Sequence, residues 1–275
     1  MSFARGSSIV RYHDRVTETA ARLLAQSRIQ HVRLSELPEP VRPQSTGEAY
    51  GCQSDVVRQL INHYGGHIVG YKIACTNTIA QRQLGVDEPF SGNLMSSFCS
   101  DSPARIAADQ FFMRVVEAEF GFGMARDLPP LSRPRERDEV AAAIEAVIPG
   151  IEIVDSRFDD WTTIGAFSLI ADNACNAAWV KGAPLADWRG IDLAAQTVKL
   201  TVNGKVVREG IGSAVLGHPL NALTWLANHL NSLGAGLQAG QYVTTGVTTE
   251  VYMAERGDRI TADFGAVGTV QLVFD

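Results

Sequence analysis

The sequence has 275 residues, of which 45% are apolar and 20% charged, and its formal net charge is -6. This composition is typical of a globular protein, and an acidic chain lacks the basic surface that nucleic-acid binding requires, so we expect no nucleic-acid partner. Residues 1–15 contain no apolar core of signal-peptide length, and no run approaches the roughly 18 apolar residues of a membrane span, so we expect a cytoplasmic protein without a membrane partner.

Residues 1–69 are predicted to form a helical appendage. Apolar residues recur at helical spacing over residues 16–27, with charges between them, which predicts an amphipathic helix. After a proline-rich linker, Ser45 with Glu48 three residues later is a capping-box signal for a second helix, which we expect to end near Gly65.

Residues 70–275 are predicted to form the main domain, in which strands dominate. Strands are expected in these segments: "HIVGYKIAC", "RVVEAEFGFGM", "GIEIVDSRF", "TVKLTVNGKVV", "QYVTTG", "DRITADF" and "GTVQLVF". Asn203 and Gly204 tolerate positive φ and predict a tight hairpin turn between two alternating runs. Helices are expected at about residues 136–147, 164–180 and 220–233. Because the strands neither alternate strictly with helices nor form an all-β series, we predict an α+β fold with a mixed, rolled or barrel-like sheet.

Three glutamates on predicted strands are candidate metal ligands. Glu117 and Glu119 are two residues apart, so both carboxylates point from the same face, about 7 Å apart at Cα. Glu152 lies in a strand that reads as buried on both faces, where a carboxylate is costly unless it is neutral, paired or bound to a cation. Together the three would form an oxygen-rich site suited to Mg²⁺ or Mn²⁺, although a solvated strand face or a salt bridge from Glu152 to Arg157 fits the same spacing.

Lys72 stands alone on a short apolar strand between Tyr71 and Ile73. Partial burial would lower the pKa of its amine and suit it to proton transfer near neutrality. The alternative is a side chain whose ammonium group reaches the surface.

Seven motifs occur in an order that resembles one family of small-molecule enzymes: "GYKIACTN", "LGVDEPFSGNL", "VEAEFGF", "IEIVDSRF", "ADNACN", "HPLNALTWLANHL" and "LQAGQYVTTG". From about Ser45 to the C-terminus, the chain is similar to the 2-keto-4-pentenoate hydratase / 4-oxalocrotonate decarboxylase family of the fumarylacetoacetate hydrolase superfamily. The resemblance implies a mixed β-roll domain of the fumarylacetoacetate hydrolase C-terminal type and a homo-oligomer.

The resemblance also implies the chemistry of the site. Glu117, Glu119 and Glu152 would hold Mg²⁺ or Mn²⁺, and Lys72 would act as the acid or base. Family substrates are small 2-oxo acids or their dienols, which arise in the breakdown of aromatic compounds. Candidate substrate-binding residues, carried over from the same motifs, are Thr76, Asp155, Asn173 and Thr245.

The chain departs from the family pattern at two places. Phe90 occupies the position after Pro89 where hydratases often have an aspartate that works on the water, and Asp87 or Glu88 could substitute from the same loop. The motif at residues 171–176 has Cys and Asn where two small hydroxyl residues are common.

These departures leave several functions open. We expect a hydratase that adds water to a 2-hydroxy-2,4-dienoate or 2-oxo-4-enoate. The alternatives are a 4-oxalocrotonate-type decarboxylase, an acylpyruvate hydrolase, and a catalytically impaired relative that binds a 2-oxo acid.

Overall fold

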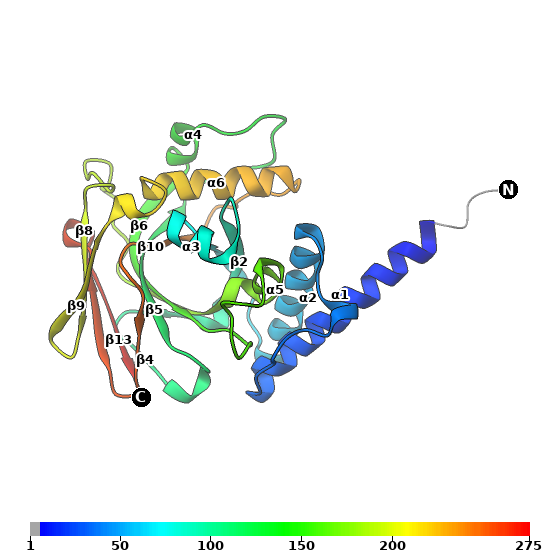
Figure 1. Ribbon diagram of the computed structural model, residues 1–275. Coiled ribbons are helices and arrows are strands. Elements are labelled where there is room, and N and C mark those ends of the chain that lie inside the picture. Colours follow the sequence, from blue (N-terminus) through cyan, green and yellow to red (C-terminus); the bar gives the residue numbers. More distant parts are fainter. Residues whose placement is uncertain (1–5) are drawn as a thin grey trace.

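Two mixed β-sheets and the helices around them make up the molecule (Figure 1). The computed structural model describes residues 6–275, with side chains described from residue 17 onward. The prediction that residues 1–15 carry no export signal therefore falls partly outside the described residues. None of the described helices is long and apolar enough to cross a membrane.

The first sheet has eight strands, in the order β2-β1-β10-β5-β6-β7-β3, with β11 also paired to β5. Its strands are β1 Ile68–Ala74, β2 Phe90–Met95, β3 Cys99–Asp101, β5 Val115–Met124, β6 Ile144–Val154, β7 Asn176–Lys181, β10 Tyr242–Val247 and β11 Tyr252–Met253. The second sheet has the order β4-β13-β12-β8-β9. Its strands are β4 Ala104–Ile106, β8 Thr197–Val202, β9 Lys205–Ile211, β12 Arg259–Asp263 and β13 Thr269–Phe274.

The largest apolar core lies between the sheets. Alternate residues of β5, such as Val116, Ala118 and Phe120, face this core and are fully buried. The same core takes in residues of β8, β12 and β13 and one face of α6 (Pro219–Ser232), which lies along the top of the sheets in Figure 1. The opposite face of β5 is therefore available for polar side chains.

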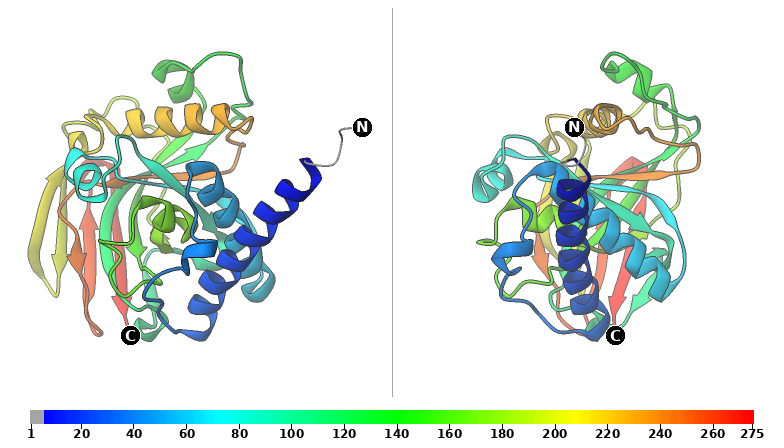
Figure 2. Two further views of the ribbon diagram at one scale, coloured as in Figure 1. Left: turned by 45° about the vertical axis from the view of Figure 1, so that its right-hand side comes forward. Right: turned by 90° about the vertical axis from the view of Figure 1, so that its right-hand side faces the viewer.

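The N-terminal helices lie at the side of the first sheet (Figure 2). Helices α1 (Gly6–Gln30) and α2 (Thr46–Tyr64) share an apolar cluster that includes Leu24 and Leu60. The Ser45 hydroxyl accepts from the Glu48 backbone N–H, as the capping-box pattern predicts. Helix α2 also packs against α5 (Ala166–Ala171).

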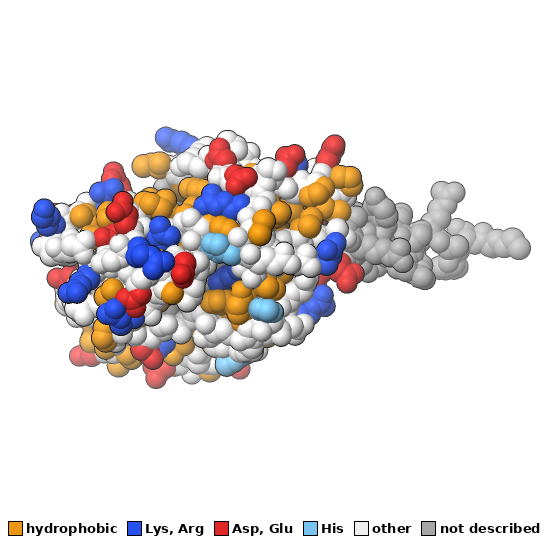
Figure 3. All heavy atoms as spheres, turned by 90° about the horizontal axis from the view of Figure 1, so that it is seen from below, with side chains coloured by type: hydrophobic (Ala, Val, Ile, Leu, Met, Phe, Trp, Pro, Cys, Tyr) orange, Lys and Arg blue, Asp and Glu red, His pale blue; other side chains and the backbone are white. Residues whose placement is uncertain are grey.

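The remaining helical segments are short. They are α3 Thr78–Leu84, α4 Arg137–Ala141 and the 3₁₀ turns η1 Glu39–Val41, η2 Ser96–Phe98, η3 Ala108–Gln110, η4 Asn173–Cys175, η5 Gly212–Ala214 and η6 Gly265–Val267. On the face shown in Figure 3, acidic and basic side chains are interspersed, with apolar side chains between them.

The predicted strands, the mixed α+β class and the hairpin at Asn203-Gly204 are confirmed, with positive φ at both turn residues. Two helix predictions were wrong. Residues 136–147 form the short α4 and then the start of β6, and residues 164–180 form α5, η4 and β7. Both segments contain continuous apolar runs, which suit a buried strand as well as a helix.

Candidate functional site

Strands β5 and β6 bring the three glutamates together. These strands are antiparallel neighbours with Glu117 directly opposite Glu152, so both side chains lie on one face, and Glu119 is two residues along β5. One oxygen from each carboxylate lies within 4.8 Å of the others. Glu119 and Glu152 are fully buried and Glu117 is partly exposed, so the cluster opens toward Glu117.

Each buried carboxylate accepts a hydrogen bond through one of its two oxygens. The Gly246 N–H donates to Glu119 Oε2 at 2.9 Å, and the Asn176 amide donates to Glu152 Oε1 at 2.8 Å. The second oxygens, Glu119 Oε1 and Glu152 Oε2, are buried and have no hydrogen-bond partner in the described part of the chain. Unpartnered buried carboxylate oxygens are costly, and a hard divalent cation prefers such ligands, so the donor set fits Mg²⁺ or Mn²⁺.

The site requires a glycine at position 246. Gly246 has φ +98°, and a Cβ there would lie 1.9 Å from the Thr76 hydroxyl oxygen. The predicted substrate-binding residue Thr76 is thus buried directly beside the backbone group that holds Glu119.

Lys72 enters the cluster from β1, which is separated from β5 by β10. Its side chain is buried, with Nζ 3.2 Å from Glu152 Oε1 and donating to the Ala174 carbonyl at 3.0 Å. The structure thus rules out both an exposed ammonium and the Glu152–Arg157 salt bridge, because Arg157 pairs with Asp172 instead.

The expected lowering of the Lys72 pKa is wrong. Burial does lower it, but the negative charges of Glu152, Glu117 and Glu119 outweigh burial and raise the pKa above its usual value. Burial is also the main cause that raises the pKa of Glu117, and it raises the pKa of Glu119 well above the ordinary range, with further contributions from the neighbouring carboxylates.

The other three predicted substrate-binding residues use their side chains on backbone groups. Asp155 accepts from the Phe112 and Met113 N–H groups, and the Thr245 hydroxyl donates to the Phe120 carbonyl. Asn173 accepts from the Asn93 N–H and donates to the Asn93 carbonyl. A substrate contact for these residues stays a prediction.

Phe90 lies beside Lys72 in the first sheet. It pairs with Ala74 while Lys72 pairs with Gly92, so Phe90 shares the face of Lys72. The ring is 5% exposed and packs with Ala174 and Cys175. Glu88, one of the two acidic residues before Phe90, accepts a hydrogen bond at 3.3 Å from the indole of Trp225 on α6.

The Trp179 side chain lies beside the carboxylates on the same face of the sheet. It pairs with Glu152 across β6 and β7, and its indole lies against Gly121 and Gly150, where a Cβ would come within 3.0 Å or less of the ring. With Leu94 and Ile148 it makes a buried apolar layer.

A hollow of about 500 Å³ adjoins this layer. Its lining includes Ile148, Lys181 and Tyr242 but none of the three carboxylates. The hollow is therefore separate from the carboxylate cluster.

Two positions were missed by sequence reasoning. Asn176 departs from the family motif, and its amide donates to Glu152. Ala174 contributes a backbone carbonyl to Lys72, for which no residue-type signal exists.

Comparisons with known proteins agree with this fold. Residues 87–274 match the family model for the fumarylacetoacetate (FAA) hydrolase C-terminal domain. The chain is 34% identical over 258 residues to a 2-keto-4-pentenoate hydratase of Paraburkholderia xenovorans (strain LB400), covering 94% of both proteins. It is 31% identical over 227 residues to a 4-oxalocrotonate decarboxylase of Pseudomonas putida, covering 82% of this chain and 84% of that protein.

A similar solved structure is a 4-oxalocrotonate decarboxylase from Pseudomonas putida G7, complexed with magnesium and adipate. It superposes with a TM-score of 0.87 at 28% identity and covers 94% of this chain and 97% of its own. The chain therefore belongs to the fumarylacetoacetate hydrolase C-terminal family, in the group that includes 2-keto-4-pentenoate hydratases and 4-oxalocrotonate decarboxylases.

Proposed function

We propose that this protein is a divalent-metal-dependent lyase that adds water to a 2-hydroxy-2,4-dienoate or 2-oxo-4-enoate. The observation that supports the proposal best is a buried lysine 3.2 Å from one of three clustered carboxylates, two of which have an unpartnered buried oxygen. The hydratases and the magnesium-bound decarboxylase among the relatives support the same reading.

Glu117, Glu119 and Glu152 would hold Mg²⁺ or Mn²⁺. When bound, the cation would supply Lewis-acid charge that binds a 2-oxo acid and stabilises its enolate. Lys72, whose Nζ lies 3.2 Å from Glu152, is placed to donate a proton to C5 of a dienol while the 2-hydroxyl group loses its proton. The Ala174 carbonyl and Glu152 orient the ammonium group for that transfer. The resulting 2-oxo-3-enoate accepts water at C4, and C3 takes up a proton.

The decay of the ultraviolet absorbance of a 2-hydroxy-2,4-dienoate tests the proposal. We expect turnover with Mg²⁺, loss of turnover in EDTA, and loss in Glu117→Gln, with Glu145→Gln as the control because Glu145 is an exposed carboxylate on the same strand as Glu152. Turnover unchanged by EDTA would contradict the metal-dependent mechanism. Binding of Mg²⁺ and oxalate without turnover of any dienoate would favour the impaired relative.

Decarboxylation of a 4-oxalocrotonate-type acid is the second candidate, and Phe90 is the observation that favours it. A buried phenyl ring stands beside Lys72 where hydratases of the family often have an aspartate, so no carboxylate from position 90 can act on water. Decarboxylation needs no activated water. Product analysis separates the two, because hydration releases no CO₂, and Phe90→Asp should raise hydration relative to decarboxylation if the ring is the deciding feature.

We further propose that the protein is cytoplasmic and assembles as a homo-oligomer, as the family resemblance implies. Light scattering of the purified protein measures the assembly. Titration with Mg²⁺ and with Mn²⁺ in parallel identifies the preferred cation.

A further inference from the structure

The segment between α5 and β7 has an unusual backbone. Three consecutive non-glycine residues, Asn173, Ala174 and Cys175, have φ of 51°, 52° and 59°. Such a run persists only where surrounding contacts enforce it. The segment supplies the Ala174 carbonyl to Lys72 and is followed directly by Asn176, whose amide holds Glu152, so its position sets both contacts.

The start of this segment is held by Arg157, which follows β6, and by the backbone of β2. Arg157 Nε donates to Asp172 Oδ1 at 2.5 Å, and its NH2 donates to the Asp172 carbonyl at 2.9 Å. The Asn173 side chain makes its two hydrogen bonds to the backbone of Asn93 on β2.

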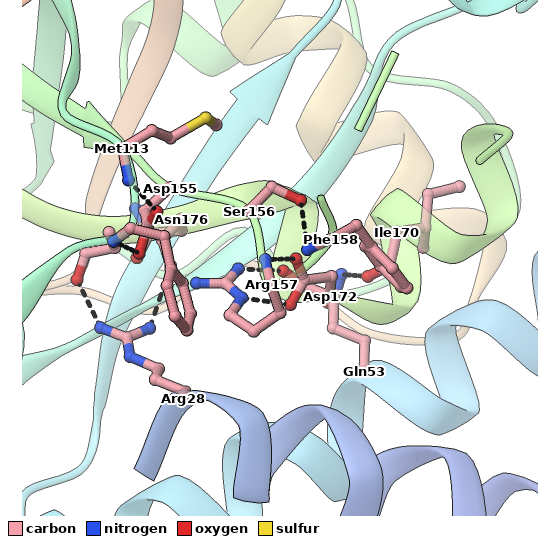
Figure 4. A network of polar contacts seen from close by, with 12 residues as sticks. Arg28, Gln53, Met113, Asp155, Ser156, Arg157, Phe158, Ile170, Asp172 and Asn176 are labelled. Carbon is pink, nitrogen blue, oxygen red and sulfur yellow. Dashed lines mark hydrogen bonds and ion pairs between the residues drawn. The ribbon is translucent and has the colours of Figure 1, made fainter. Parts of the chain in front are cut away.

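The end of the segment is fixed from α1, by Arg28 (Figure 4). Its guanidinium donates to the Asn176 carbonyl at 3.1 Å and to the Ala177 carbonyl at 2.7 Å, and it lies 3.9 Å above the Phe98 ring. The β6–β7 register shifts here, because Val154 pairs with Asn176 while Ile153 pairs with Ala178. Ala177 is thus the extra residue of a β-bulge, and its carbonyl is satisfied from outside the sheet.

We propose that Arg28 is a positioning residue for the metal and proton-transfer site, acting through Asn176. The planar guanidinium binds two successive carbonyls at once in a fixed geometry, which the flexible ammonium of a lysine reproduces less well. Without it, two carbonyls at the bulge lose their donor, the backbone at Asn176 relaxes, and the Asn176 amide withdraws from Glu152. The inference assigns a role at the site to the N-terminal helix and rests on the proposed function of the carboxylate cluster.

The charge of Arg28 is maintained in this position. Burial, and next the nearby Arg157, lower the pKa of Arg28 to about 10, so the guanidinium stays cationic at neutral pH. The contact with the Phe98 ring and the two carbonyls then compensate for its partial desolvation.

Arg33 provides a matched control. It donates one hydrogen bond to the Asp159 carbonyl and lies 5.3 Å from the Phe112 ring, but it has no contact with residues 172–177 among the interactions described. Arg28→Met and Arg28→Lys should therefore be compared with Arg33→Met.

Two measurements need no turnover. In Arg28→Met we expect Mg²⁺ affinity to fall roughly tenfold by calorimetry, as for other residues that orient metal ligands, and Arg28→Lys should recover part of it. In the metal-free protein, amide hydrogen exchange of residues 172–178 should be faster in Arg28→Met than in Arg33→Met. If wild type binds Mg²⁺ but turns over no dienoate, the proposed function fails and these measurements still decide the role of Arg28.

A double-mutant cycle with Asn176→Ala identifies the route of the effect. If Arg28 acts through Asn176, adding Arg28→Met to Asn176→Ala should change Mg²⁺ affinity and kcat little further. The proposal would be overturned if the losses of Mg²⁺ affinity caused by the two substitutions multiply in the double mutant. It would also be overturned if Arg28→Met keeps wild-type Mg²⁺ affinity and kcat, whatever its melting temperature. Should Arg28→Met fail to fold, Arg28→Lys in the same cycle decides between these outcomes.

Discussion

Replacing Glu119 with glutamine should stabilise the metal-free protein and abolish its stabilisation by Mg²⁺. Oxygens of the three carboxylates lie within 4.8 Å of one another. Two unit charges at that distance repel by about 3.5 kcal/mol at an effective dielectric constant of ~20. Where Glu119 is ionised, Glu119→Gln removes two of the three repulsive pairs and one attraction to Lys72, which at similar separations is a net gain of up to about 3.5 kcal/mol. For a domain of this size the gain corresponds to roughly 7 °C in Tm.

The effect depends on pH with a definite sign. The pKa of Glu119 is raised in the folded protein, so its protonated form contributes stability that is complete below the unfolded pKa and is lost as pH rises through the folded pKa. The advantage of Glu119→Gln in EDTA should therefore grow as the pH rises from the ordinary glutamate pKa through the raised pKa of Glu119. A cation binds the deprotonated carboxylates, so Mg²⁺ affinity of the wild type should rise over the same range and binding should release protons.

Differential scanning calorimetry in EDTA and in Mg²⁺, with Glu145→Gln as the exposed control, measures the stability difference. Isothermal titration in two buffers of different ionisation enthalpy counts the protons released. The reasoning is refuted if Glu119→Gln is less stable than wild type in EDTA across this range, or if wild type binds Mg²⁺ without releasing protons.

Lys72→Met should lower turnover by roughly 10²–10⁴-fold while Mg²⁺ and oxalate still bind, because the proton donor is lost and the carboxylates remain; wild-type turnover in a stopped assay would disprove the acid–base role. Gly246→Ala should lower Mg²⁺ affinity about tenfold, since its Cβ would lie 1.9 Å from the Thr76 oxygen and displace the N–H that holds Glu119. Gly257→Ala is the control, because Gly257 also has a positive φ, +91°, but has open space where a Cβ would lie. If both variants lose the same Mg²⁺ affinity in calorimetry, the steric overlap with Thr76 is not the cause.

Much of the fold could be predicted because its signals are local. Alternation along β5 placed Glu117 and Glu119 on one face, and Asn203-Gly204 marked the hairpin. The boundaries near residues 144 and 176 could not be predicted, because an apolar run suits a helix or a buried strand. In the second case, α5 ends where Arg157 binds Asp172, a contact fifteen residues apart in the chain.

The side chains of the candidate site could be predicted from the sequence, but the contacts that hold them in place could not. Carboxylates and a lysine in apolar strands are unusual enough to be noticed individually, whereas the sign of the Lys72 pKa shift depends on how many charges surround it. Arg28 could not be found from sequence, because its partners are backbone carbonyls about 150 residues away, at a bulge that no residue type marks.

The buried layer of Trp179, Leu94 and Ile148 bears on how molecules enter and leave the site. Because Glu119 and Glu152 are fully buried beside this apolar layer and Glu117 is partly exposed, we expect reactant and product to share the route past Glu117. A product that still occupies that route obstructs the next reactant, so kcat depends on the rate of product release as well as on the rate of the chemical step.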